Sequence, residues 1–292
     1  MTLSDSALDY WVVDVFTDRA FAGNPLAVVL DADALTTEQM QAIAREFNLS
    51  ETTFPVATTA AGADYRLRIF TPTSELPFAG HPSVGTAWLL QSLGRLTPGR
   101  VVQDCLAGLL PLDVAVDAVT LTGATPTLGD AVNTEELCAA VGLAASDIVD
   151  AGSRWAGCGL QWAYLRVNDD AVARARPDLA RLTALSASDP DRAGLVVLSW
   201  TDGFAHARVF AGGVGVAEDP ATGSAALGLG VWLAAAGLVP GDATTSYEIA
   251  QGAEMQRPSQ LSCLVRTQEG RAVECQVRGA VRPVANGRIS VP

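Results

Sequence analysis

Two stretches of the chain read as copies of one another, and this internal repeat constrains the fold more than any other feature. The first spans residues 68–90 and the second spans residues 208–233. Each begins with Arg, a β-branched residue and Phe, passes through a loop to an acidic residue and a proline, and continues from a glycine turn into an apolar run. When the copies are aligned, identical residues recur at the same spacing: Glu75 with Glu218, Pro77 with Pro220, Gly80 with Gly223, Gly85 with Gly228 and Leu90 with Leu233. Such self-similarity predicts two related halves.

The same physical logic applies to both copies. A predicted strand leads into a glycine turn, and the apolar runs at 82–93 and 224–236 predict helices that are buried nearly all round. The first N–H groups of a helix have no partner within it, and together with the helix dipole they can hold an anion such as a carboxylate. If the halves face each other, the two helix starts converge on one cleft.

Length and patterning predict the domain organisation. A chain of 292 residues is long enough for about two domains that each bury a core. The Thr-Gly-Ala-Thr-Pro stretch at 122–126 is the best linker candidate, so we expect one half at 1–126 and another at 127–292, with C-terminal strands able to return to the first half. Strands alternate with hairpin-like turns and one central helix per half, which favours an α+β fold.

Composition excludes several classes of function. The net charge is −13 and the chain has no lysine, so a nucleic-acid partner or an anionic membrane surface is not expected. Without lysine there is no Schiff base to pyridoxal phosphate and no lysine-bearing P-loop. No apolar run reaches the roughly 18 residues of a membrane span, and the N-terminal residues show no signal-peptide pattern, so we expect a cytoplasmic location.

Metal and thiol chemistry are also disfavoured. The five cysteines are scattered with no CxxC pair, none stands at a glycine turn, and the chain has only two histidines, His81 and His206. We therefore predict no metal site, and we interpret the cysteines as buried, reduced thiols.

The first half contains well-marked local signals. Residues 11–30 predict two strands joined by a Gly-Asn-Pro turn. Thr36 with Gln39 predicts a capping box at a helix start, and Asn48 suits the left-handed residue that ends this helix. Glu51 then lies at the junction between this helix and the following strand, where side chains often point into a rim or cleft.

Four blocks of the chain resemble the phenazine-biosynthesis isomerase (PhzF-like) family, within the wider diaminopimelate epimerase fold. The blocks read VDVFTDRAFAGNPLAVVL, NLSETTF, FTPTSELPFAGHPSVGTAWLL and RVFAGGVGVAEDPATGSAA. The resemblance implies two pseudo-symmetric domains, each a curled β-sheet around a central α-helix, with the active site between them. It also implies cofactor-independent isomerisation of a small carboxylated substrate by a homodimer.

The resemblance also assigns roles to residues. In epimerases of this fold two cysteines at the glycine turns act as acid and base, and this chain has neither, so two-thiol chemistry is disfavoured. The isomerase branch uses a glutamate in the block matched by NLSETTF, which places the role on Glu51. The equivalents of His81, Asp219 and Ser224 line the same pocket. Asn24 corresponds to an asparagine that presents its amide to the substrate.

Each candidate has a chemical role and a structural alternative. As a proton shuttle Glu51 needs a pKa drawn toward neutrality, which desolvation in an apolar cleft provides; read alone, it is a solvated charge. At a helix start His81 is favoured as neutral imidazole that bonds the substrate or relays a proton, or it only caps the turn. Asp219 can orient His81 or share its proton across the cleft, or it caps the following helix.

The binding candidates leave similar alternatives open. Ser224 offers a hydroxyl beside helix-start amides, or it serves as a cap. Gly80 and Gly223 give a ligand access to backbone N–H groups, or they only meet the needs of a turn. Asn24 binds the substrate, or it belongs to an ordinary Asn-Pro turn.

We therefore predict an isomerase that shifts a hydrogen or double bond in a small carboxylated metabolite. Two other classes stay open, namely a non-catalytic protein that binds small acids and a scaffold protein that uses the fold only for association. A cysteine-dependent epimerase is a weaker alternative.

Overall fold

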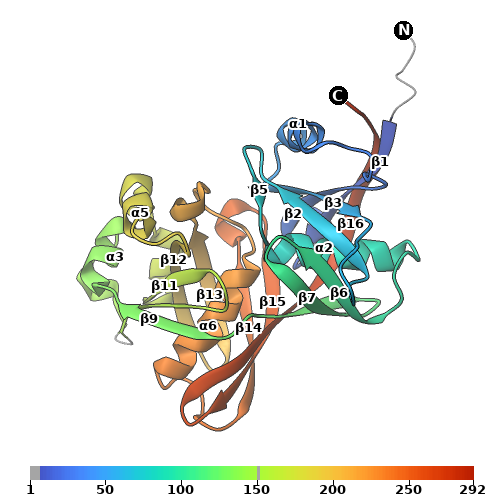
Figure 1. Ribbon diagram of the computed structural model, residues 1–292. Helices are drawn as coiled ribbons and strands as arrows, with labels where there is room; N and C mark the ends of the chain where they lie inside the picture. The colour runs from blue at the N-terminus through green and yellow to red at the C-terminus, as the bar shows by residue number, and fades with distance from the viewer. Residues whose placement is uncertain (1–6, 150–151) are drawn as a thin grey trace. The chain divides into compact units, whose positions relative to one another are not determined.

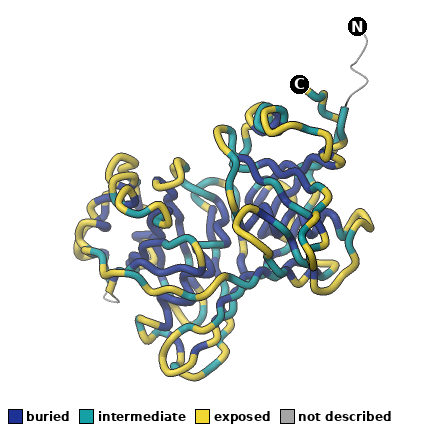
Figure 2. Tube along the Cα trace, viewed as in Figure 1, coloured by how far each residue is buried: buried dark blue, intermediate teal, exposed yellow. Residues whose placement is uncertain are grey.

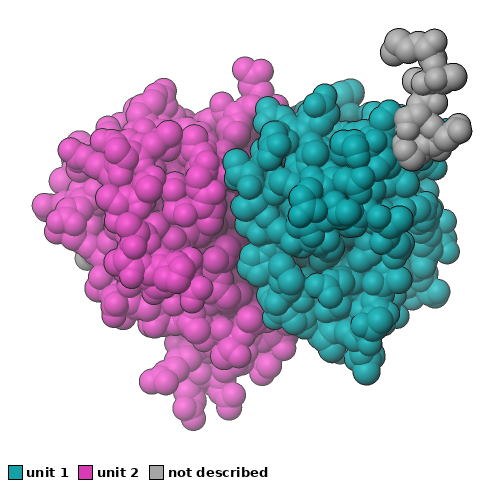
Figure 3. All heavy atoms as spheres, turned by 45° about the horizontal axis from the view of Figure 1, so that its top comes forward, with its two compact units in different colours: residues 1–121, 279–292 teal, residues 122–278 magenta. Residues whose placement is uncertain are grey.

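The computed structural model describes residues 7–149 and 152–292, and the chain forms two compact units (Figure 3). Unit 1 comprises Met1–Leu121 and Gly279–Pro292, and unit 2 comprises Thr122–Arg278. The division falls at Leu121/Thr122, whereas the sequence places it at 126/127, and the C-terminal segment from Gly279 returns to unit 1. The predicted domains 1–126 and 127–292 stay a prediction.

Unit 1 is a curled sheet around one helix (Figure 1). Its strands follow the order β1-β2-β3-β4-β6-β7-β8-β16, and β16 also pairs with β1, so the sheet closes on itself. The β2–β3 and β4–β6 pairs are parallel, and the short β5 pairs only with β4 among the described residues. The strands are β1 (Ala7–Val15), β2 (Asn24–Val29), β3 (Glu51–Val56), β4 (Tyr65–Phe70), β5 (Glu75–Leu76), β6 (Gly99–Cys105), β7 (Gly108–Val114), β8 (Ala118–Thr122) and β16 (Arg271–Ser290).

Unit 2 repeats this arrangement with more helix outside its sheet. Its strand order is β9-β10-β11-β12-β13-β14-β15 followed by the first part of β16, and β11–β12 and β13–β14 are parallel. The strands are β9 (Thr127–Ala131), β10 (Arg154–Gly157), β11 (Gln161–Arg166), β12 (Arg192–Thr201), β13 (Phe204–Phe210), β14 (Thr244–Gln251) and β15 (Ser259–Gln268). The outer helices are α3 (Thr134–Ala140), α4 (Asp169–Arg174) and α5 (Leu179–Ser186), with 3-10 turns η1 (Ala145–Asp147), η2 (Gly212–Val214) and η3 (Ala253–Met255).

Each unit is built around one buried helix of 13 residues, α2 (Gly80–Ser92) in unit 1 and α6 (Gly223–Ala235) in unit 2. Every residue of α2 from Gly80 to Leu90 is buried, and α6 is buried from Ala225 to Ala234 (Figure 2). Helices this apolar on all sides have no solvent face, which is why both lie inside their sheets. The predicted α+β architecture, a curled sheet around a central helix in each half, is confirmed.

A glycine at the sixth position of each central helix lets the sheet approach closely. A Cβ on Gly85 would meet the methyl groups of Leu26 and Val15, each at 2.7 Å. A Cβ on Gly228 would collide with the Tyr164 hydroxyl and lie 2.8 Å from the carbonyl oxygen of Ala156. Both glycines therefore let the helix pack closely against the strands.

An arginine–glutamate pair braces the loop before each central helix. In unit 1, Arg68 Nε and Nη2 donate to the two carboxylate oxygens of Glu75 at 2.8 and 2.7 Å. In unit 2, Arg208 donates to Glu218 in the same two-pronged way, at 2.8 and 2.8 Å. Each guanidinium also lies over the phenylalanine ring two residues further along its strand, 5.1 Å away in unit 1 and 5.0 Å away in unit 2. The sequence repeat is thus present in three dimensions.

The local signals of the first half are confirmed at α1 (Thr37–Phe47). Thr36 is its N-cap and forms the predicted capping box with Gln39, and Asn48 ends the helix in the left-handed conformation at φ 50°. This ending turns the chain sharply, so that β3 begins at Glu51 only a few residues later.

The predicted Gly-Asn-Pro turn is wrong. Asn24 and Pro25 are the first residues of β2, paired with Val15 and Asp14, and the connection from β1 occupies residues 16–23. Proline is tolerated here because it stands at the start of the strand. The left-handed residues that reverse the chain are Phe16, Phe21 and Gly23.

No helix among the described residues is long and apolar enough to cross a membrane.

Candidate functional site

Three of the predicted site residues come together in unit 1. Asn24 opens β2 and Glu51 opens β3, and because these strands run parallel, both residues lie at the same edge of the sheet. His81 is the second residue of α2 and is buried, 6% exposed. Its Nε2 lies 3.3 Å from Glu51 Oε2, and its Nδ1 lies 3.2 Å from Asn24 Nδ2. The imidazole therefore joins the amide and the carboxylate.

Burial decides the charge of this histidine. Desolvation lowers the pKa of His81 to about 3, so the ring is neutral at physiological pH. The Ser50 hydroxyl donates to Asn24 Oδ1 at 3.4 Å, which turns the amide nitrogen of Asn24 toward His81. Since an amide N–H can only donate, Nδ1 of His81 is the acceptor and Nε2 carries the ring proton. Nε2 is also the ring atom that lies 3.3 Å from Glu51 Oε2.

Glu51 is the least buried of the three, with 15% of its side chain exposed. A carboxylate that is mostly buried but still reaches solvent can meet a ligand and exchange protons with it. Gly80 is the first residue of α2, and the N-cap before it, Ala79, makes no side-chain capping bond. The amides of this first helical turn are therefore not satisfied by a side chain of the cap.

A buried polar chain supports the start of α2. The Tyr65 hydroxyl donates to Gln103 Oε1 at 2.9 Å, and Gln103 Nε2 donates to the Ser83 hydroxyl at 3.0 Å. Ser83 in turn donates to the carbonyl oxygen of Ala79 at 2.9 Å. Sequence reasoning missed these residues, because no local pattern links β4, β6 and the helix.

In unit 2 the predicted residues lie at the turn before α6. Asp219 accepts a hydrogen bond from the Thr222 hydroxyl at 2.5 Å, and Ser224 accepts one from the Trp162 indole at 3.2 Å. Gly223 begins the helix, and Thr222, rather than Asp219 or Ser224, is its N-cap residue. The catalytic or binding roles predicted for Asp219, Gly223 and Ser224 stay predictions, as do those of the unit 1 residues.

The partners of Asp219 and Ser224, which are Thr222 and Trp162, were also not predicted from the sequence. Thr222 carried a signal, since it stands directly before a glycine that opens a helix, where capping residues are common. Trp162 carried none, because its contact with Ser224 joins positions 62 residues apart.

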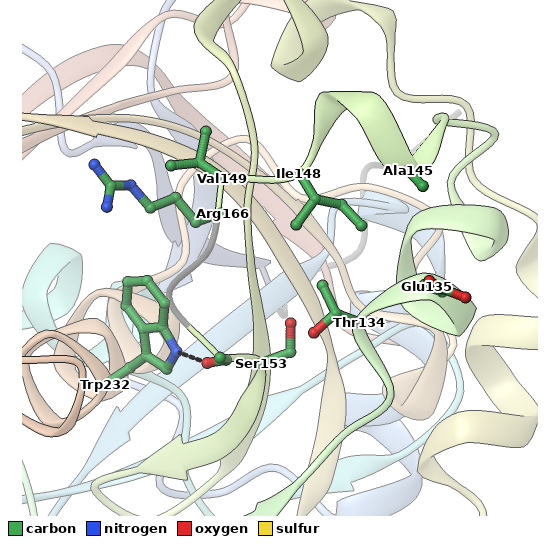
Figure 4. Close-up of a pocket in the computed structure, with 9 residues that line it drawn as sticks. Thr134, Glu135, Ala145, Ile148, Val149, Ser153, Arg166 and Trp232 are labelled. Carbon is green, nitrogen blue, oxygen red and sulfur yellow. Dashed lines mark hydrogen bonds between the residues drawn. The ribbon is translucent and has the colours of Figure 1, made fainter.

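A separate cavity of about 310 Å³ lies in unit 2 (Figure 4). Trp232 of α6 and Arg166 of β11 line one part of it, and Thr134 and Glu135 at the start of α3 line another. The Trp232 indole donates to the carbonyl oxygen of Gly152 at 3.0 Å. None of the predicted site residues lines this cavity, so it is distinct from the candidate site.

Within residues 7–149 and 152–292, no three His, Cys, Asp or Glu side chains gather closely enough to hold a metal ion. All five cysteines are buried free thiols, as the sequence predicted. Burial raises the pKa of Cys105, Cys138 and Cys263, which makes these thiols weak nucleophiles.

Comparisons with known proteins agree with one another. The family model for PhzC-PhzF, described as phenazine biosynthesis-like protein, matches residues 13–287. An uncharacterized isomerase of Pasteurella multocida is 36% identical over 97% of this chain and 94% of its own length. The trans-2,3-dihydro-3-hydroxyanthranilate isomerase of Pseudomonas aeruginosa is 34% identical over 96% of this chain and 98% of its own length.

Solved structures share the fold. A phenazine biosynthesis protein of the PhzF family from Bacillus anthracis superposes with a TM-score of 0.86 at 26% identity, covering 97% of this chain and 99% of that one. A hydroxyproline epimerase from Agrobacterium vitis has a TM-score of 0.67 at 13% identity, covering 99% of this chain and 94% of that one. The second likeness concerns the fold alone.

Proposed function

Because the chain belongs to the phenazine biosynthesis-like (PhzF) family, we propose that it isomerises a small carboxylated metabolite with Glu51 as the proton shuttle. The family that four sequence blocks predicted is confirmed, and so is the predicted class of enzyme, a PhzF-like isomerase. The substrate, the glutamate mechanism and independence of a cofactor belong to the proposal.

The observation that carries the proposal is the cluster formed by buried Asn24, buried His81 and partly buried Glu51. A base that takes a proton from carbon must be held in place and must be able to release the proton again. His81 Nε2 lies 3.3 Å from Glu51 Oε2, and because the ring is neutral it places no full positive charge beside the carboxylate. A cation at that distance would favour the ionised carboxylate and weaken it as a base.

In the proposed reaction the Glu51 carboxylate accepts a proton from a C–H bond that an adjoining unsaturated group acidifies. The C–H electron pair forms a new double bond to the neighbouring carbon, and the electrons of the original double bond shift to the carbon at its far end. Glu51 then returns the proton to that second carbon, so no electrons leave the substrate. Positioned acid–base help of this kind contributes about 10²–10⁴-fold in rate.

We propose that the helix starts bind the acid group of the substrate. Gly80 in unit 1 and Gly223 with Ser224 in unit 2 present first-turn amides, which favour a carboxylate. Asn24 and Asp219 are proposed to help orient the substrate and its proton. A common cleft for both units, a homodimer and a cytoplasmic location stay predictions.

A nuclear magnetic resonance assay tests the reaction class. The protein is incubated in D2O with trans-2,3-dihydro-3-hydroxyanthranilate, the compound named for a relative, and with a panel of cyclic amino and hydroxy acids. An isomerase yields a product with a displaced hydrogen, and the receiving carbon carries deuterium to the extent that Glu51 exchanges its proton with D2O before returning it. Saturable binding of an acid with neither change would instead support a non-catalytic small-acid binding protein.

A further inference from the structure

Gln251 is the last residue of β14 and its side chain is buried, 3% exposed. Its amide bonds to residues 218–223, named here the EDPATG turn, which precede α6. Oε1 accepts the backbone N–H of Thr222 at 3.2 Å, while Nε2 donates to the Asp219 carbonyl at 2.7 Å and to Thr222 Oγ1 at 3.1 Å. One buried amide thus uses both its acceptor and its donors on a single turn.

The same turn is fixed by two further contacts. The Thr222 hydroxyl donates to the Asp219 carboxylate at 2.5 Å, which links the side chain of Asp219 to the network around Gln251. Gly252, at φ +79°, follows Gln251, and a Cβ there would lie 2.6 Å from the Pro220 carbonyl oxygen. The end of β14 therefore packs closely against the EDPATG turn, and a side chain at residue 252 would collide with it.

We infer that Gln251 is a positioning residue that holds the EDPATG turn in the shape in which the start of α6 binds the anionic group of the substrate. This inference rests on the proposed function. By accepting the Thr222 amide, Gln251 fixes the orientation of the next two amides, those of Gly223 and Ser224, which lie outside the intrahelical ladder. Gln251 itself does not touch the substrate.

This role makes a specific kinetic prediction. The acid group of the substrate is bound throughout the reaction, so loosening its binding site weakens ground state and transition state alike and raises KM. A general loss of stability acts differently, because it reduces the fraction of folded enzyme, which lowers the apparent kcat and leaves KM unchanged. The two parameters therefore separate positioning from stability.

The test compares Gln251→Met with wild type, and Gln260→Ala serves as the control. Methionine matches the volume of glutamine in a buried site, and Gln260 is an exposed glutamine on the adjacent β15. We expect Q251M to raise KM about tenfold and to change kcat less than about threefold, while Q260A changes neither. An unchanged KM in Q251M, or a fall in kcat alone, overturns the inference.

A second variant and a binding assay keep the test independent of folding and turnover. Thr222→Val removes the hydroxyl that joins Asp219 to the network but leaves Gln251 in place, and it should raise KM in the same direction. If wild type binds anthranilate, a fluorescent carboxylate, but isomerises no acid, the proposed isomerase function fails. The positioning role of Gln251 is then tested by the dissociation constants for anthranilate alone. A Kd about tenfold weaker in Q251M supports it, and an equal Kd, or no binding by wild type, overturns it.

Discussion

The two units hold their central helices with the same devices but place different chemistry at the helix start. Both have a forked Arg–Glu pair before the helix and a glycine at its sixth position. Unit 1 then presents a titratable pair, His81 and Glu51, whereas unit 2 presents a turn fixed by the neutral side chains of Thr222 and Gln251.

This difference separates scaffold from chemistry. The repeated Arg–Glu pairs brace the loops, and the repeated glycines Gly85 and Gly228 allow close packing. One position after the glycine that opens each central helix, unit 1 has His81 and unit 2 has Ser224. The titratable pair belongs to unit 1, and the turn held by Gln251 belongs to unit 2. The sharpest ways to test this comparison mutate matched positions in the two units.

Replacing the two arginines should give the largest difference between the units in the loss of unfolding free energy. Arg208 is 6% exposed and also donates to the Ala175 carbonyl at 2.8 Å, so Arg208→Met leaves Glu218 and a buried carbonyl without their partner. We expect a loss of about 3–5 kcal/mol in the free energy of unfolding. Arg68, whose side chain is 19% exposed, should cost only about 1–2 kcal/mol in R68M because water can replace it.

Urea denaturation of both variants measures this difference. Equal losses for R208M and R68M would show that the two forks are equivalent in energy as well as in geometry, and would contradict the prediction.

Replacing the helix glycines should give a smaller difference in unfolding free energy, again with the larger loss in unit 2. Gly228→Ala pushes a methyl group against the backbone of Ala156, which cannot move without disturbing β10, so we expect a net loss of about 2–3 kcal/mol. In Gly85→Ala the neighbours are the methyl ends of Leu26 and Val15, which can rotate away. The higher helix propensity of alanine, about 1 kcal/mol, then offsets much of the strain.

Thermal and urea unfolding of the two alanine variants test this prediction. A G85A variant that is less stable than G228A would show that the side-chain contacts in unit 1 are the more rigid.

The smallest effect near physiological pH should be a pH dependence that belongs to unit 1. The native pKa of His81 is about 3 and the unfolded value is about 6.5. Between these values the unfolded chain binds more protons, so the free energy of unfolding falls as pH drops from about 6.5 toward 3, by at most about 1.4 kcal/mol per pH unit. The contribution is fully present above pH ~6.5.

Urea denaturation at several pH values isolates this contribution. His81→Gln should make the free energy of unfolding depend less steeply on pH between about 6.5 and 3. His206→Gln, which removes the other histidine, should leave this dependence in place. A slope that survives unchanged in H81Q would mean that His81 is not buried as a neutral ring.

Much of the fold could be predicted because its signals are local or repeated. The capping box of Thr36 and Gln39 lies within one helical turn, and the pairing of Gly80 with Gly223 marks both central helices. Glu51 was found because it stands at a helix-to-strand junction inside a recognisable block. The proximity of Asn24 to His81 depends on how α2 packs against β2, which the sequence does not display.

Other features could not be predicted because similar sequence segments adopt different structures in different environments. Phe21 and Trp155 both begin an aromatic-Ala-Gly segment, yet Phe21 is 75% exposed at φ 64° and Trp155 is 2% exposed within β10. The amide of Phe21 donates to the buried carboxylate of Asp14 at 2.7 Å, a contact between residues seven apart that the sequence does not show. Gln251 was missed for the same reason, since its partners lie on another element.

The most direct test of the central claim is the turnover of Glu51→Gln on any acid that the wild-type protein isomerises, with the exposed glutamate variant Glu46→Gln as the control. The amide keeps the shape of the side chain but cannot accept the proton. We predict that kcat falls by about 10²–10⁴-fold in E51Q and stays at the wild-type value in E46Q. An E51Q enzyme that retains wild-type kcat would contradict the assignment of Glu51 as the proton shuttle.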